Sequence, residues 1–215
     1  MIVYFLLLTA AAVLFSTQFL LNQKFEAECG SSLSASMLFA ALTSVGGFIV
    51  LFVLNRFKLV FSWYSMILAG VYALVNILYT TASAKAFEAV NLSVYSMFAM
   101  LGGMLLPSVY GVIFANESIT VPKIVSCVLI AVSLFLSVDF KPTRGNKLYY
   151  AAVFVLNGLV GVISAIHQSN TEWAVDSISF LMLSRIFGGI ISGVFCLSKN
   201  RIRVTKKSVY YAFGF

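Results

Sequence analysis

Long apolar runs, broken by short polar stretches, follow one another along the chain. A bilayer core about 30 Å thick is crossed by roughly 20 residues of α-helix, and most of these runs have that length. Their hydropathy is continuous and does not alternate, which favours helices over the strands of an outer-membrane barrel. The pattern predicts seven complete spans, at residues 1–22, 32–54, 63–84, 92–115, 121–138, 148–168 and 178–197, and an eighth that begins near Ser208.

The first run is predicted to be a membrane span and not a cleaved signal peptide. No basic residue precedes it, and Gln18 and Asn22 lie where a signal peptidase requires small side chains. Residues 1–22 therefore count among the spans.

The composition supports a membrane environment. Hydrophobic residues make up 61% of the 215 residues and charged residues 10%, and the mean hydropathy of +1.00 lies far above that of soluble domains. We therefore expect an all-α integral membrane protein, a polytopic helical bundle. Cys29, Cys127 and Cys196 lack the spacing of a disulfide framework or a metal site, and we expect neither a metal nor a cofactor.

The chain resembles itself when it is shifted by 145 positions. Nine identical pairs result: Tyr4 and Tyr149, Leu14 and Leu159, Gln23 and Gln168, Ser32 and Ser177, Ser34 and Ser179, Met37 and Met182, Leu38 and Leu183, Asn55 and Asn200, and Arg56 and Arg201. This register predicts a first unit of five spans over residues 1–138, a linker over 139–147, and a truncated second unit over 148–215. Because five is odd, the units would insert in opposite orientations, so we expect an inverted repeat with ten spans in all.

Three segments carry a resemblance to a known family. A basic loop follows the second span at residues 55–58, the third span ends in residues 82–86, and the fourth ends in residues 116–120. Together with the two inverted five-helix units, these features resemble the EamA type of the drug/metabolite transporter superfamily. One departure is Pro107, because the family's proline usually lies a few residues earlier relative to the glutamate.

The resemblance implies a secondary active transporter of the bacterial plasma membrane, which exports a small metabolite such as an amino acid or a drug-like compound by alternating access. It implies a substrate cavity between the two units. The expected partners are a small-molecule substrate and the lipid bilayer, with a homodimer left open and no nucleic acid. The alternative is a multi-span channel, receptor or structural protein without carrier activity. An enzyme is not expected, because the chain has one histidine and no acidic residue in the middle of a predicted span.

Polar residues recur within several spans, where a buried polar group needs a partner. In the third and the sixth span they are spaced by three or four residues, which places them on one helix face. The candidate substrate-binding residues are Tyr72, Asn76, Tyr79, Tyr95, Asn157, Ser164, Gln168 and Arg185. The alternative is that these side chains only join the helices by hydrogen bonds.

Arg185 is the charged residue that lies clearly within a span. One interpretation is a structural arginine that pairs with Asp176 or Glu172 in the preceding loop. The other is contact with the substrate, which a carboxylate on the substrate would favour. His167, near the end of the sixth span, is expected to be an interfacial hydrogen-bonding residue and not a proton relay.

Small residues repeat every four positions in the fourth span. Ala99, Gly103, Pro107 and Gly111 form a ridge that allows close helix packing, and Pro107 is expected to kink the helix. Glu117 follows this span, where a carboxylate can accept hydrogen bonds from the free amides of the next helix. We expect Glu117 to latch the hairpin of the fourth and fifth spans.

The net charge of +7 is interpreted as a signal of membrane topology. Alternate loops carry ten basic residues on one side of the predicted membrane and three on the other. The positive-inside rule then places the amino terminus outside, whereas the family resemblance implies that both termini are cytoplasmic. These two indications leave the orientation open.

Overall fold

The computed structural model describes residues 2–30, 32–89, 92–115, 118, 120–137, 148–198 and 206–213. Helices dominate these residues, and the described part of the chain contains no strand. They are α1 (Ile2–Cys29), α2 (Leu33–Leu54), α3 (Trp63–Ala89), α4 (Leu92–Phe114), α5 (Val121–Ser137), α6 (Leu148–Ser169), α7 (Ser177–Ser198) and α8 (Lys206–Phe213). The predicted all-helical class is confirmed, and each predicted run is helical.

Five of these helices, α2, α3, α4, α6 and α7, are long and apolar enough to cross a membrane. Most residues in their apolar windows are not buried inside the protein, and large side chains such as Ile49, Leu78 and Ile113 are exposed. An exposed apolar surface of this extent needs lipid around it. The seven spans and the ten-span repeat predicted from the sequence go beyond these five helices and stay predictions.

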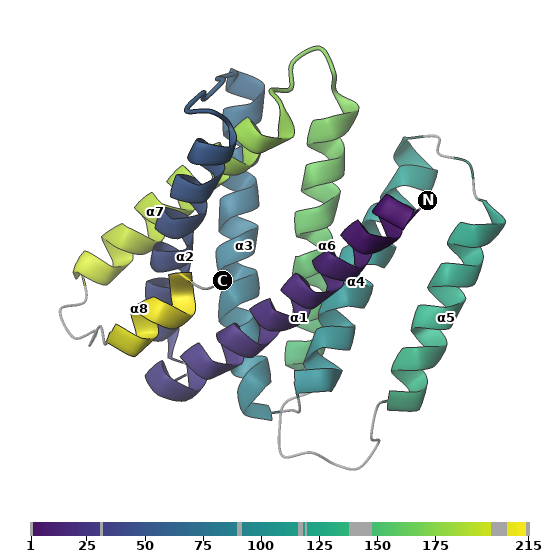
Figure 1. Ribbon diagram of the computed structural model, residues 1–215, viewed down its shortest axis with the longest axis horizontal. Coiled ribbons are helices and arrows are strands. Elements are labelled where there is room, and N and C mark those ends of the chain that lie inside the picture. The colour runs from purple at the N-terminus through teal and green to yellow at the C-terminus, as the bar shows by residue number, and fades with distance from the viewer. Residues whose placement is uncertain are drawn as a thin grey trace.

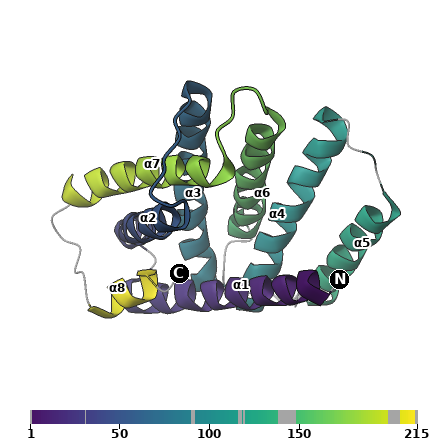
Figure 2. The same cartoon turned by 45° about the horizontal axis from the view of Figure 1, so that its top comes forward.

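The five apolar helices form the body of the molecule (Figure 1). α4 packs along α6, α3 lies between α6 and α7, and α7 also packs on α2. α1 runs crosswise to α3, α4 and α6 in Figure 2, with α8 beside it. α5 stands at the edge of the bundle and contacts α4.

α1 is longer than the sequence predicts. It continues past residue 22 to Cys29, and Phe25 and Glu26 in its polar extension are buried. The helix ends where Gly30 takes a φ of +79° and its N–H donates to the Glu26 carbonyl at 2.8 Å. Glycine adopts this left-handed conformation without steric cost, which makes it a common residue after a helix.

Glycines allow α4 and α6 to approach closely. A methyl group on Gly102 would overlap the backbone carbonyl of Phe154, and a methyl group on Gly158 would overlap Leu106 and the carbonyl of Gly102. Small residues permit such contact between membrane helices, whose association depends on van der Waals packing. This interface holds α6 firmly against the first half of the chain.

The α2–α3 loop and the α6–α7 loop lie side by side at one end of the bundle (Figure 1). The backbone N–H of Val60 donates to the Ser179 hydroxyl at 3.2 Å. The Ser62 hydroxyl donates to the Trp173 carbonyl at 2.7 Å. We call these two contacts the loop clasp, which joins segments that are more than 100 positions apart in the sequence.

Candidate functional site

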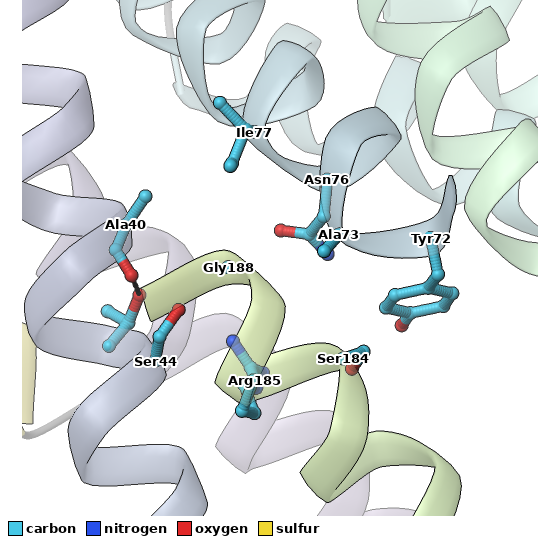
Figure 3. A pocket seen from close by; sticks show the side chains of 10 residues that line it. Ala40, Ser44, Tyr72, Ala73, Asn76, Ile77, Ser184, Arg185 and Gly188 are labelled. Carbon is cyan, nitrogen blue, oxygen red and sulfur yellow. Dashed lines mark hydrogen bonds between the residues drawn. The ribbon is translucent and has the colours of Figure 1, made fainter. Parts of the chain in front are cut away.

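A small pocket opens where α2, α3 and α7 meet (Figure 3). We call it the Arg185 pocket. It is lined by Ala40, Thr43, Ser44, Tyr72, Ala73, Asn76, Ile77, Ser184, Arg185 and Gly188. The cavity volume is about 20 Å³, which leaves room for about one water molecule. In this conformation the pocket is too small for a metabolite.

Gly47 makes room for the Arg185 side chain between α2 and α7, and Gly188 makes room for Ser44. A methyl group on Gly47 would lie 3.1 Å from Arg185 Nε, so the guanidinium lies against the backbone of α2 at this point. A methyl group on Gly188 would lie 2.9 Å from Ser44 Oγ. The close approach of α2 and α7 therefore depends on small residues on both helices.

The Arg185 guanidinium has no acidic partner among the described residues. No carboxylate lines the pocket, and none of the described acidic residues forms an ion pair with Arg185. Asp176 lies nine residues earlier, which the helical rise converts to roughly 13 Å along α7. The structural pairing of Arg185 with Asp176 or Glu172, one of the two interpretations from the sequence, is therefore not found.

Asp176 serves a different purpose, as the cap of α7. Its Oδ1 accepts a hydrogen bond from the backbone N–H of Ser179 at 2.9 Å. Burial alone would raise the pKa of the Asp176 carboxyl, but hydrogen bonds from the Ser179 side chain and from backbone amides hold the pKa below its ordinary value. A carboxylate at a helix N-terminus is favoured by the helix dipole.

The polar side chains of the pocket differ in how far they are already hydrogen-bonded. The Thr43 hydroxyl donates to the Phe39 carbonyl at 2.8 Å, and the Ser184 hydroxyl donates to the Leu181 carbonyl at 2.7 Å. These two hydroxyls keep only their acceptor positions for a ligand.

The remaining three polar side chains of the pocket are those of Ser44, Tyr72 and Asn76. They have no hydrogen bond to any residue in the part of the chain that the structure describes. In Figure 3, the polar ends of Ser44, Asn76 and Arg185 turn toward the same space. The pocket therefore offers several uncommitted donors beside one cation.

Tyr79 and Tyr95, two other candidates, lie together but in a separate network. Tyr95 is fully buried and donates to Ser83 Oγ at 2.8 Å, while its hydroxyl lies 2.9 Å from that of Tyr79. Because the single proton of Tyr95 is committed to Ser83, Tyr79 must be the donor to Tyr95. Phe19 and Phe87 pack against the Tyr95 ring, at centroid distances of 5.6 and 4.1 Å. This network joins α3 and α4 and is enclosed by side chains.

Asn157 joins α6 to α4. Its Nδ2 donates to the backbone carbonyl of Ala99 at 2.6 Å, and a methyl group on Gly103 would lie 2.8 Å from the same nitrogen. The hydrogen bond is thus made where Gly103 allows the amide to reach the neighbouring helix. This contact corresponds to the alternative interpretation, in which polar side chains only join helices.

Ser164 and Gln168 pair with each other along α6. Gln168 Nε2 donates to Ser164 Oγ at 3.1 Å, and Gln168 is exposed. Neither residue lines the Arg185 pocket. Of the eight candidate residues, the structure therefore brings Tyr72, Asn76 and Arg185 into one pocket and distributes the other five over three other places.

His167 is buried at the end of α6 and anchors the following loop. Its Nε2 lies 3.0 Å from Ser65 Oγ, which also accepts the backbone N–H of Val175 at 3.0 Å. The imidazole stacks on Phe180 with a centroid distance of 4.0 Å. These contacts dock the α6–α7 loop on the start of α3.

Three of the four residues predicted to be structural, Gly103, Pro107 and Gly111, lie along α4. The helix continues through Pro107, and a methyl group on Gly161 of α6 would meet the Pro107 ring. Gly111 is buried. Glu117 lies outside the described residues. Among the residues that are described, no group of histidine, cysteine or acidic side chains could hold a metal ion.

Sequence reasoning missed four polar or charged features of the interior. Glu26 is buried with 8% of its surface exposed, although the predicted first span ends before it. The spacing of Phe19, Asn22 and Glu26, by three and then four residues, is the signal from which a longer first helix could have been predicted.

The pocket residues Thr43, Ser44 and Ser184 were also missed. On α2, the series Ala40, Thr43, Ser44 and Gly47 marks one face of small and polar residues.

Comparison with known proteins gives no assignment. No protein-family model matches the sequence, and no curated protein matches it.

Proposed function

We propose that this chain is a carrier that moves a small metabolite across the membrane by alternating access around the Arg185 pocket. The observation that carries the proposal is an intramembrane arginine with uncommitted polar neighbours at the junction of α2, α3 and α7. Charged residues inside membrane bundles typically mark pathways for substrates or ions. α2 and α3 belong to the first predicted unit and α7 to the second, so the pocket lies between the units, where carriers built from repeats bind substrates.

The pairing of the helices supports an inverted repeat. The shift of 145 positions relates α1 to α6, α2 to α7 and α3 to α8. We replace each helix by its partner under this shift and compare the contacts. The contact of α3 with α6 then corresponds to that of α8 with α1, and the contact of α3 with α7 corresponds to that of α8 with α2; all four contacts are present. The contact of α2 with α7 is converted into itself. Two units related by a two-fold axis produce this pattern, and we propose that α1 and α5 complete the seven spans of the described part.

The small volume of the pocket fits one step of a transport cycle. A metabolite needs more space than the present cavity offers, so α2 and α7 must separate to admit it. Rocking of one unit against the other provides such a motion in carriers with repeats. The resemblance to EamA-type transporters, which implies export of a small metabolite, belongs to the same proposal.

Transport into sealed vesicles tests the proposal. The purified protein is reconstituted in liposomes, and uptake of radiolabelled metabolites is measured with and without the same metabolite inside. A carrier shows saturable uptake that internal substrate accelerates, whereas a channel shows no such acceleration. Absence of uptake and exchange for every metabolite tested would contradict the proposal.

A matched pair of amide variants tests the location of the site. Asn76→Ala removes an uncommitted donor from the pocket, and we expect the apparent KM to rise about tenfold because one hydrogen bond to the substrate is lost. Gln168→Ala removes an exposed amide outside the pocket and should leave the KM unchanged. Equal effects of the two variants would move the site away from the Arg185 pocket.

A further inference from the structure

We propose that the Arg185 pocket binds the carboxylate group of a monoanionic substrate, with the guanidinium as its counter-charge. This inference rests on the proposed transport function and specifies the substrate class. It concerns the head group of the substrate, which is the part that would contact Arg185 once the pocket, now about 20 Å³ in volume, has widened.

The first argument is the charge of the pocket. Arg185 projects from near the middle of α7, and the ten residues that line the pocket include no carboxylate. A charge buried in a membrane protein is costly unless it is paired or hydrated. Asp176, the nearest acidic residue before it in sequence, is used to cap α7. A carboxylate on the substrate supplies the missing negative charge.

The second argument is the set of donors. The guanidinium presents a planar fork of N–H groups that matches the two oxygens of a carboxylate. The hydroxyls of Ser44 and Tyr72 and the amide of Asn76 add donors from α2 and α3. A carboxylate bound here would bridge three helices, and two of them belong to one predicted unit while the third belongs to the other.

The third argument is the net charge of the filled pocket. One arginine neutralises one negative charge, so a phosphate dianion would leave an excess negative charge inside the bundle. An ammonium group next to the carboxylate, as in an amino acid, would find only neutral acceptors such as Thr43, Ser184 and the Asn76 carbonyl. The pocket therefore favours simple monocarboxylates over phosphates and over zwitterions.

Acid and amide pairs of nearly equal shape test the inference without any mutation. Binding of propionate and propionamide, and of benzoate and benzamide, is measured on the purified protein in nanodiscs by calorimetry. We expect each acid to bind about ten- to a hundredfold more tightly than its amide, because the hydrogen bonds to a charged group are lost in the amide. Inorganic phosphate and alanine should bind more weakly than propionate. Equal binding of acid and amide, tighter binding of phosphate, or no binding of any acid would overturn the inference.

Variants at Arg185 test whether this residue causes the preference for acids over amides. Arg185→Gln should abolish the preference for the acid, and Arg185→Lys should retain part of it, because lysine keeps the charge but not the planar fork. Lys24→Gln removes an exposed cation from α1 and serves as the matched control. If Arg185→Gln does not fold, the inference is still tested by Arg185→Lys and by the comparison of acid with amide on the wild-type protein.

The inference and the transport function fail in distinguishable ways. If the protein transports a neutral metabolite and Arg185→Gln leaves that transport unchanged, the carboxylate inference fails but the carrier function stands. If acids bind in a way that depends on Arg185 but none of them is transported, the carboxylate-binding site stands but the carrier function fails.

Discussion

At the scale of single residues, many hydroxyl groups inside these helices are satisfied within their own helix. Thr17, Thr43, Thr81 and Ser108 each donate to the carbonyl four residues earlier. This back-bonding allows a hydroxyl to lie in an apolar environment without a partner on another helix. Arg185 cannot be satisfied in this way, because it carries a charge and five donors.

The Tyr95 hydroxyl should contribute measurably to stability. Tyr95→Phe leaves the Tyr79 hydroxyl without its acceptor in a buried place, and we expect a loss of about 1 kcal/mol in the free energy of unfolding. Thermal unfolding in mild detergent, followed by circular dichroism, measures the change. Tyr110→Phe is the control, because Tyr110 stacks on Phe114 and donates to no described residue. Equal losses in the two variants would show that the network contributes nothing.

The cap of α7 should make stability depend on acid pH. The pKa of Asp176 is lower in the folded chain, so its carboxylate stabilises the fold above the unfolded pKa of about 3.9. This stabilisation is lost as the pH falls through the folded pKa. Asp176→Ala should cost about 1 kcal/mol at neutral pH, and Asp176→Asn less, because asparagine also caps helices.

Unfolding of these variants from pH 7 down to about 3 measures this dependence. Both variants should lose less stability on acidification than the wild type, whereas Glu172→Gln, at an exposed position in the same loop, should behave as the wild type. An unchanged acid response in Asp176→Ala would assign the effect to another group.

At the scale of elements, the length of the apolar runs was sufficient to predict where the helices lie. α2, α4 and α6 begin and end within one residue of the predicted limits, because each apolar run stops at a polar break. α1 was predicted too short, since residues 23 to 28 are mostly polar, yet Phe25 among them is buried in a cluster with Leu38 and Phe39 of α2 and Ala212 of α8. Periodicity can indicate that such a residue is buried, but it does not identify its partners, which lie far away in the sequence.

The contact between α4 and α6 should tolerate no additional methyl group. Gly102→Ala places its methyl group against the backbone of Phe154, which cannot rotate away as a side chain can. We expect a loss of about 1–3 kcal/mol in the free energy of unfolding. Thermal unfolding and the fraction of protein that inserts in a folded form measure it.

Gly70→Ala is the matched control for this interface. Nothing lies within 4 Å of a methyl group at Gly70 in α3, so the substitution should be neutral or stabilise the helix by up to about 1 kcal/mol. A loss at Gly70 as large as that at Gly102 would indicate that the glycines act through the backbone and not through packing.

At the scale of the whole molecule, the sequence grouped polar residues by helix face but could not tell which faces meet. The candidate residues on four helices were expected to share one cavity, yet Asn157 reaches α4 and the Tyr79 and Tyr95 hydroxyls bond to each other. The rotation and crossing of each helix decide these partners. They follow from contacts such as those of Gly102 and Gly158, which become visible only in the packed structure.

If the proposed transport function is correct, a disulfide between α2 and α7 should stop the transport cycle. A Cβ on Gly188 lies 4.0 Å from Ser44 Cβ, which is within the usual range of disulfides. The pair Ser44→Cys and Gly188→Cys, in a chain whose three native cysteines are replaced by serine, should lose vesicle uptake on oxidation and regain it on reduction. Each single cysteine variant, treated in the same way, is the control. Undiminished uptake by the cross-linked protein would mean that α2 and α7 do not separate during transport.

The loop clasp gives this separation a direction. The segment just before α3 is hydrogen-bonded to the segment around the start of α7, through Val60 and Ser179 and through Ser62 and Trp173. Because of these bonds, the two segments can rotate about each other at this end of the bundle more easily than they can separate there. A pivot at one rim converts a small rotation into the largest displacement at the opposite face of the bundle. We therefore expect water to reach Arg185 first from the side remote from the clasp.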